Sequence, residues 1–142
     1  MLGNTNLNEN QIIDALCQHL TTNGYQILNR CLTTQRGIDI IAKHSSTSVR
    51  LLVEAKGGTS AQRSSARYNR GFNPNQVFDR VAKGLYTAIC LLSQYQSAGD
   101  KVALAFPDTD QFRLRLEAIR PALLELNILV YLVSADKNVR EF

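Results

Sequence analysis

Two short apolar segments carry three charged residues at positions that could share one face of a β-sheet. Residues 37–42 (Gly-Ile-Asp-Ile-Ile-Ala) contain Asp39, and residues 51–56 (Leu-Leu-Val-Glu-Ala-Lys) contain Glu54 and Lys56. Both segments are predicted to be strands, because they are rich in Ile, Leu and Val and lie between Gly and Ser clusters. Side chains alternate between the two faces of a strand, so Glu54 and Lys56 point to the same side. Antiparallel pairing of the segments would place Asp39 beside Glu54.

The three side chains could form a metal site. A carboxylate within an apolar strand is costly to bury unless it is paired or binds a cation. Mg²⁺ prefers oxygen ligands and often binds through one or two carboxylates, water and substrate phosphate oxygens. Asp39 and Glu54 could hold Mg²⁺, with Mn²⁺ as a substitute, while Lys56 orients or deprotonates an attacking water and stabilises charge on the phosphate. The alternative is an internal ion pair between Lys56 and one of the acids in an ordinary mixed sheet.

The composition predicts one globular domain over residues 1–142. A hydrophobic content of 44% and a charged content of 20% exclude a disordered chain. The net charge of +4 fits a polyanionic partner such as nucleic acid without requiring one. The three cysteines are far apart and include no Cys-x-x-Cys pair, and no apolar run is long enough to cross a bilayer. We therefore expect a soluble cytoplasmic protein without a membrane partner.

The elements that position the charged residues follow the hydrophobic periodicity. Apolar residues at helical spacing predict a first helix over 6–23, in which Asn6 and Glu9 form a capping box at the start. Glu9 has two interpretations: it caps this helix and complements its dipole, or it reaches the acidic site as a further ligand for metal or water. Three strands are then expected in an antiparallel meander, because their connections are too short for crossovers. They span 25–33, 37–43 and 49–56.

Residues 57–75 are predicted to form a long polar loop that follows the acidic strands directly. The basic residues of this loop are Arg63, Arg67 and Arg70, and Tyr68 and Phe72 lie between or beside them. Arginine and aromatic side chains together suit phosphate contacts and base stacking. Long loops of this kind are usually functional or mobile. The alternatives are therefore a substrate-binding loop and a solvated insert.

A second long helix is predicted over 76–95, with Asn75 as its cap. Gln76, Arg80 and Lys83 share one of its faces near the start, where they could face the same cleft as the arginine loop. Solvation at the surface is the competing explanation for Arg80 and Lys83.

The last third of the sequence predicts two buried strands, 101–106 and 128–133, because each is a nearly continuous apolar run. Between them a helical segment begins at Thr109 or Asp110 and is expected to be interrupted by Pro121. The tail from residue 136 is polar. The resulting order, α-β-β-β-α-β-α-β, predicts an α/β fold around a mixed sheet with the acidic strands in its interior.

This order, with Asp39 on the second strand and Glu54-x-Lys56 on the third, resembles the PD-(D/E)XK nuclease superfamily. The Gly-Ile-Asp-Ile-Ile-Ala segment after the helix end at Gly24 is similar to the restriction-endonuclease-like and Holliday-junction-resolvase-like branches. The resemblance covers about residues 7–106 and implies a restriction-endonuclease-like αβββαβ core, followed by an added helix and strand. Two features depart from the pattern. Ile38 replaces the proline of the motif, and Glu9 lies about one helical turn further from Gly24 than the corresponding glutamate usually does.

The resemblance implies a metal-dependent endonuclease that hydrolyses DNA phosphodiester bonds. Asp39 and Glu54 would hold Mg²⁺, Lys56 would position or activate water, and Glu9 would complete the site. The residues implied in nucleic-acid binding are Arg63, Arg67, Arg70, Gln76 and Arg80. Many relatives cut as dimers, so a homodimer is possible.

Two other classes of function remain open. The chain could be a non-catalytic or latent nucleic-acid-binding subunit of a restriction, repair or recombination assembly. It could also be a scaffold protein with an internal ion pair.

Overall fold

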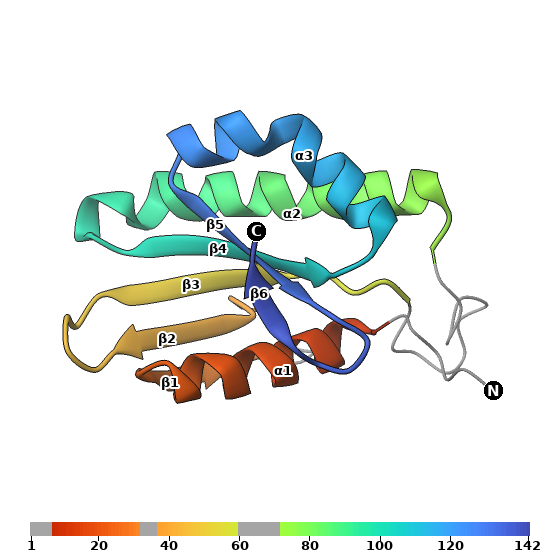
Figure 1. Cartoon of the computed structure of the whole chain (residues 1–142). Helices are drawn as coiled ribbons and strands as arrows, with labels where there is room; N and C mark the ends of the chain where they lie inside the picture. The colour runs from red at the N-terminus through yellow and green to blue at the C-terminus, as the bar shows by residue number, and fades with distance from the viewer. Residues whose placement is uncertain (1–6, 32–36, 60–71) are drawn as a thin grey trace.

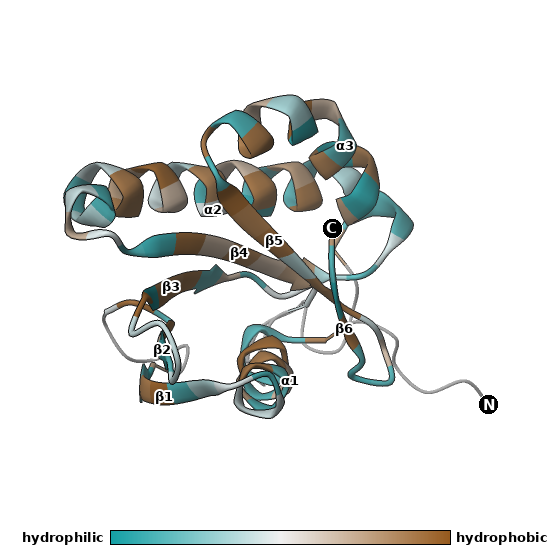
Figure 2. Cartoon of the chain, turned by 60° about the vertical axis from the view of Figure 1, so that its left-hand side comes forward, coloured by the Kyte–Doolittle hydropathy of each residue, from teal (hydrophilic) through white to brown (hydrophobic). Residues whose placement is uncertain are grey.

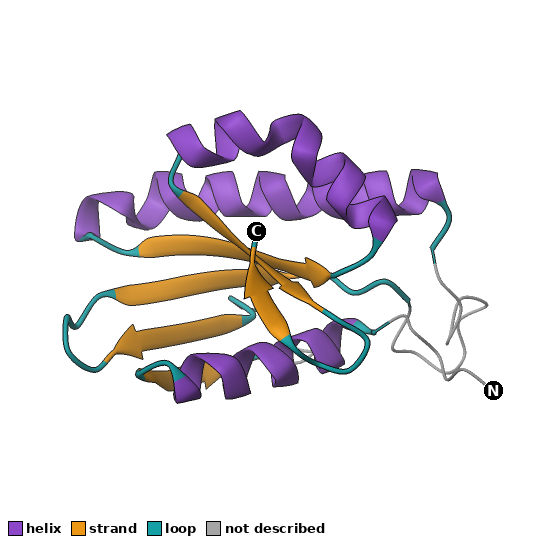
Figure 3. Cartoon of the chain, in the orientation of Figure 1, coloured by secondary structure: helices purple, strands orange, loops and turns teal. Residues whose placement is uncertain are grey.

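A six-stranded mixed β-sheet forms the centre of the structure, a computed structural model that describes residues 7–31, 37–59 and 72–142. The strands are β1 (Tyr25–Arg30), β2 (Ile40–His44), β3 (Arg50–Ala55), β4 (Lys101–Pro107), β5 (Ile128–Val133) and β6 (Val139–Glu141). They lie in sequence order across the sheet (Figures 1 and 3). β1, β2 and β3 pair antiparallel, β3, β4 and β5 pair parallel, and β6 returns antiparallel to β5.

Helices cover both faces of the sheet, which makes the chain an α/β protein. They are α1 (Glu9–Thr22), α2 (Pro74–Tyr95) and α3 (Asp110–Glu125), and a 3₁₀ turn (Gln96–Ala98) follows α2. α1 lies on one face, whereas α2 and α3 lie together on the other (Figure 1). α2 joins β3 to β4 and α3 joins β4 to β5, so each parallel connection uses a helix as its crossover. Within the described part of the chain, no helix combines the length and apolar character needed to cross a membrane.

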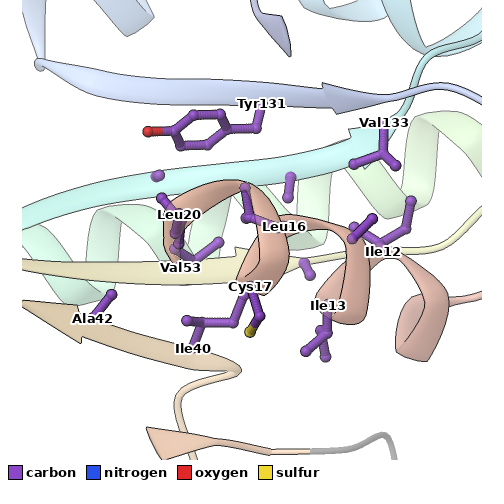
Figure 4. Close-up of a cluster of buried hydrophobic side chains, with 14 of the residues drawn as sticks. Ile12, Ile13, Leu16, Cys17, Leu20, Ile40, Ala42, Val53, Tyr131 and Val133 are labelled. Carbon is purple, nitrogen blue, oxygen red and sulfur yellow. The ribbon is translucent and has the colours of Figure 1, made fainter. Parts of the chain in front are cut away.

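Each face of the sheet buries its own apolar cluster. Along β3, Val53 and Ala55 belong to the cluster beneath α1, whereas Leu52 belongs to the cluster beneath α2 and α3. Figure 4 shows the first cluster, where side chains of α1 such as Leu16 meet those of β2, β3 and β5. β4 and β5 are apolar over most of their length (brown in Figure 2), as expected for strands that are covered on both faces.

The predicted order of helices and strands is confirmed, and one strand is added to it. The meander of the first three strands and the interior position of β2 and β3 are as predicted. The sequence did not predict β6, which lies within the polar tail. This short strand pairs with β5, and its Arg140 Nε donates to Asp108 Oδ2 at 2.9 Å, just beyond the end of β4. β6 therefore forms without an apolar run in its sequence, and a polar contact with a distant segment accompanies its pairing with β5.

The predicted helix starts were wrong by a few residues. The N-cap of α1 is Asn8 rather than Asn6, and the N-cap of α2 is Asn73 rather than Asn75. In both helices the Asn side-chain oxygen accepts the backbone N–H of the Gln three residues later. The side-chain oxygen of that Gln in turn accepts the backbone N–H of the Asn. These are reciprocal Asn-x-x-Gln capping boxes, which satisfy two backbone donors at once.

Pro121 does not interrupt α3, so the prediction of a break there was wrong. The helix runs continuously from Asp110 to Glu125 with the proline inside it. Proline removes one intrahelical hydrogen bond, whose acceptor would be the carbonyl of Glu117. Pro121 and Glu117 are both exposed, so water can replace the missing donor.

A glycine directly after β3 allows the start of α1 to lie against the end of that strand. A Cβ atom added to Gly57 would lie 2.4 Å from the backbone nitrogen of Glu9 and 2.7 Å from the carbonyl carbon of Asn8. No real side chain tolerates such distances to backbone atoms, so the close approach requires glycine at this position. Gly57 thereby fixes where the first turn of α1 sits relative to β3.

Backbone hydrogen bonds extend this contact to the residues on either side. Gly58 N–H donates to Leu7 O at 2.7 Å, and Phe72 N–H donates to Gly58 O at 3.1 Å. Asn8 and Thr59 form an isolated parallel bridge beside these bonds. The start of α1, the chain after β3 and the residue before the cap of α2 are therefore tied together at one end of the sheet.

Substitution of Gly57 by alanine tests this contact. We expect Gly57→Ala to destabilise the protein by about 1–3 kcal/mol, the usual range for overpacking, because backbone rather than a flexible side chain must move. Urea denaturation monitored by circular dichroism measures the change in the free energy of unfolding. An unchanged free energy would show that α1 does not sit this close to β3.

Candidate functional site

Asp39 lies immediately before β2, whose first residue is Ile40, so its predicted position in the middle of a strand was wrong. Its carboxylate Oδ2 accepts the backbone N–H of Ala55 at 2.8 Å. If the β2–β3 pairing continued past Ile40, the Ala55 N–H would donate to a backbone carbonyl before β2. The Asp39 side chain accepts this N–H instead, which explains why β2 begins only at Ile40. Its backbone carbonyl accepts the N–H of Cys31 at 2.8 Å. Asp39 is therefore held from both neighbouring strands.

The predicted proximity of Asp39 and Glu54 follows from the register of β2 and β3. Ile40 pairs with Val53, so continuing the register by one residue brings Asp39 opposite Glu54. The bond from the Ala55 N–H to Asp39 Oδ2 also places the Asp39 carboxylate beside the residue that follows Glu54.

Glu54 and Lys56 lie on the same side of β3 and form an ion pair, with Lys56 Nζ 3.0 Å from Glu54 Oε1. Their side chains are only 11% and 17% exposed, so water screens the pair weakly. Because Val53 and Ala55 face α1, the alternation along the strand directs Glu54 to the face that α2 covers. Lys56 N–H donates to Ala105 O at 3.0 Å, which continues the pairing of β3 with β4.

Burial and neighbouring acids make Asp39 difficult to ionise. They raise the pKa of Asp39 from 3.8 to about 7, with burial as the main cause and the negative charge of Glu54 as the next. The Ala55 N–H acts in the opposite direction by stabilising the carboxylate, and the charge of Lys56 does so more weakly. The charge of Glu9 raises the pKa further. An acid with this environment favours any cation that can approach it.

The charge of Glu9 acts on Asp39, although Glu9 comes from α1 on one face of the sheet. The close approach at Gly57 brings the first turn of α1 to the end of β3. The capping-box interpretation of Glu9 is wrong, because Asn8 and Gln11 form the box. Glu9 does lie in the first turn of α1, where its charge complements the helix dipole. That Glu9 also reaches the acidic site as a ligand stays a prediction.

The donor set fits a hard divalent cation that keeps part of its water shell. Asp39 and Glu54 offer carboxylate oxygens close together, which is the protein contribution that Mg²⁺ commonly uses. Within the described residues, no three His, Cys, Asp or Glu side chains converge into a preformed cage. The remaining positions around an ion would therefore belong to water and substrate oxygens, with Glu9 within electrostatic range.

The predicted nucleic-acid contacts fall into two groups. Arg63, Arg67 and Arg70 lie outside the described residues. Gln76 and Arg80 lie in the first two turns of α2, and the Gln76 side chain already serves the capping box through its Oε1. Arg80 places its guanidinium carbon 4.9 Å from the centre of the Phe72 ring.

The close approach of α1 to Gly57, which places Glu9 at the end of β3, was not predicted from the sequence. The signal was present, because two glycines follow Glu54-x-Lys56 directly and a glycine at a strand end often marks a close backbone approach. What lies opposite the glycine is a segment 48 residues earlier in the chain. No local pattern indicates that partner.

Comparison of the chain with models of protein families, with curated proteins and with solved structures finds no match.

The raised pKa of Asp39 predicts a pH-dependent effect of Asp39→Asn. Because the folded-state pKa of about 7 exceeds the ordinary 3.8, the proton on Asp39 stabilises the fold fully below pH 3.8, and this stability is lost as pH rises to about 7. Asparagine removes that loss and can still accept the Ala55 N–H. We expect the variant to be more stable than the wild type at pH 8, by at most a few kcal/mol at about 1.4 kcal/mol per pKa unit.

Urea denaturation at pH 4 and pH 8 measures this difference. The two proteins should have similar free energies of unfolding at pH 4, where the carboxyl is protonated. A difference of equal size at both pH values would show that charge on Asp39 is not its cause.

Proposed function

We propose that the chain is a metal-dependent nuclease of the PD-(D/E)XK type that hydrolyses DNA phosphodiester bonds. One observation carries the proposal. Asp39 and Glu54 come together at the adjoining ends of two interior strands, with Lys56 paired to Glu54 and with burial and acidic neighbours raising the pKa of Asp39 to about 7. Because burial and the charge of Glu54 disfavour ionisation of Asp39, a cation bound beside the Asp39 carboxylate would offset both effects.

The roles of the residues follow from their chemistry. Asp39 and Glu54 would hold Mg²⁺, which when bound supplies Lewis-acid stabilisation of the phosphate and a more acidic water. Lys56 keeps an ammonium beside Glu54, where it can orient the attacking water and stabilise negative charge that develops on the phosphate. Glu9 adds a third carboxylate from α1 that could bind a water of the cation.

An internal ion pair alone explains less of the structure. The Glu54–Lys56 pair is what that alternative expects, but it leaves the carboxylate of Asp39 unexplained. None of the ion pairs among the described residues involves Asp39, whose hydrogen-bond donor there is a backbone N–H. A scaffold would have no need to bury a second acid against Glu54. A latent binding subunit would share the cation site, and only turnover distinguishes it from a nuclease.

Thermal stability measures cation binding independently of catalysis. We expect Mg²⁺ or Mn²⁺ to raise the melting temperature of the wild type at pH 8, because a ligand that binds only the folded state stabilises it. Asp39→Asn removes a charged ligand and should abolish most of this shift. The same shift in the variant would place the bound cation elsewhere.

Cleavage assays test the reaction itself. Plasmid, linear, branched and single-stranded DNA are incubated with Mg²⁺ or Mn²⁺, with EDTA and Asp39→Ala as controls. We expect metal-dependent cutting that Asp39→Ala abolishes and that Lys56→Met lowers by about 10²–10⁴-fold, the usual range for a group that assists proton transfer.

Lys101→Met is the matched control, because Lys101 is exposed and pairs in register with Leu51 at the other end of β3. Wild-type cleavage by Lys56→Met would contradict the role of this lysine. No cutting of any substrate, together with cation binding and salt-sensitive DNA binding, would favour the latent subunit.

A further inference from the structure

The direction of α2 places its first turns over the end of β3 that carries Glu54. At the start of β3, the guanidinium of Arg50 lies 5.9 Å from the ring of Tyr95 in the last turn of α2. Beyond the other end of β3, Gly58 O accepts the N–H of Phe72, just before α2 begins. α2 therefore runs antiparallel along β3, as Figure 1 also shows.

The two flanks of α2 have different neighbours. One flank faces α3, and the groove between the helices is lined by Phe78, Val81, Ala82, Leu85, Arg115, Ala118 and Ile119. The helical periodicity places Gln76, Arg80 and Lys83 on the opposite flank. Because α3 packs over β5, this opposite flank lies on the side of β3 and β2, from which Glu54 and Asp39 come. Arg80 therefore lies on the flank nearest the acidic site.

An aromatic ring supports Arg80 in this position. The guanidinium carbon is 4.9 Å from the centre of the Phe72 ring, and Phe72 packs in turn against the apolar cluster beneath α2. The backbone of Phe72 is fixed by its bond to Gly58, two residues after Lys56. A guanidinium whose face lies on a ring keeps the N–H donors of its edge available. Within the described residues, Arg80 forms no ion pair with an acid that would use those donors.

We propose that Arg80 binds a backbone phosphate of the nucleic acid beside the carboxylates, and that Phe72 is the positioning residue that holds its guanidinium in place. The inference rests on the proposed nuclease function, because it places the contact at the same end of the sheet. Planar guanidinium groups bind phosphate oxygens in a bidentate manner, which a flexible ammonium does not reproduce. A phosphate contact carries no base information, so it contributes to affinity and register on DNA of any sequence.

A second arginine–phenylalanine stack in the same region provides a matched control. Arg115 lies with its guanidinium carbon 5.3 Å from the centre of the Phe78 ring, on the flank of α2 that faces α3. Arg115→Gln changes the charge and removes the stacking cation as Arg80→Gln does, but on the side away from the carboxylates. Any effect of net charge alone should be the same in both variants.

The experiment measures binding of a fluorescein-labelled DNA duplex by fluorescence anisotropy in EDTA, over about 50–200 mM salt. Loss of one phosphate contact should reduce the salt slope by about 0.9, which corresponds to about eightfold weaker binding at about 0.1 M salt. We expect this loss for Arg80→Gln, a smaller loss for Arg80→Lys, and a change of less than about twofold for Arg115→Gln.

A double variant separates positioning from general stability. If Phe72 acts through Arg80, Phe72→Leu should weaken binding alone but add nothing in the Arg80→Gln background. Circular dichroism checks that each variant is folded. If Phe72→Leu is unfolded, the comparison of Arg80→Lys with Arg80→Gln tests the phosphate contact instead. The inference is overturned if Arg80→Gln binds like Arg115→Gln, if the wild type does not bind the duplex, or if Phe72→Leu weakens binding equally with and without Arg80.

Asp39→Asn distinguishes this inference from the proposed function. The variant should lose cleavage and keep the Arg80-dependent affinity. If the wild type cuts DNA but Arg80 contributes nothing to affinity, the proposed phosphate contact is wrong and the proposed nuclease function stands. If the wild type binds DNA through Arg80 but never cuts it, the proposed nuclease function is wrong and the phosphate contact stands.

Discussion

Burial of the Asp39 carboxylate next to Glu54 is the constraint on which the end of the sheet depends. Like charges at a shielded position oppose ionisation, and the Ala55 N–H and the ammonium of Lys56 only partly offset this. The same backbone N–H fixes the carboxylate in place, which ends the β2–β3 ladder at Ile40. The β2–β3 ladder is therefore shortened in favour of a hydrogen bond to an acidic side chain whose pKa is strongly raised, and such pKa shifts are concentrated at functional sites.

Packing and backbone contacts from several elements surround the strand that carries Glu54. β3 is covered on both faces, so its backbone is fixed by separate apolar clusters beneath α1 and beneath α2 and α3. Two helices then reach the same strand end by different means. α1 approaches through Gly57, where any side chain would collide with backbone, and α2 is tied through the bond from Phe72 to Gly58. The starts of α1 and α2 are thus both tied to the strand end that carries Glu54.

The sequence predicted what depends on local periodicity and missed what depends on distant partners. The order of elements and the adjacency of Asp39 and Glu54 follow from apolar patterns and short connections, and both are confirmed. The helix starts were misplaced because Asn-rich segments offer several caps in succession, and only the reciprocal bond with Gln11 or Gln76 selects one of them. The contact between the start of α1 and Gly57 could not be predicted, because the two contacting segments are far apart in the chain.

The charges around Asp39 bear on the proposed cation site. When all groups are ionised, the carboxylates of Glu9, Asp39 and Glu54 together with the ammonium of Lys56 have a formal charge of −2. One divalent cation neutralises that charge, whereas a proton on Asp39 neutralises only half of it. Burial is the main cause of the raised pKa of Asp39, and the negative charges of Glu54 and Glu9 add to it.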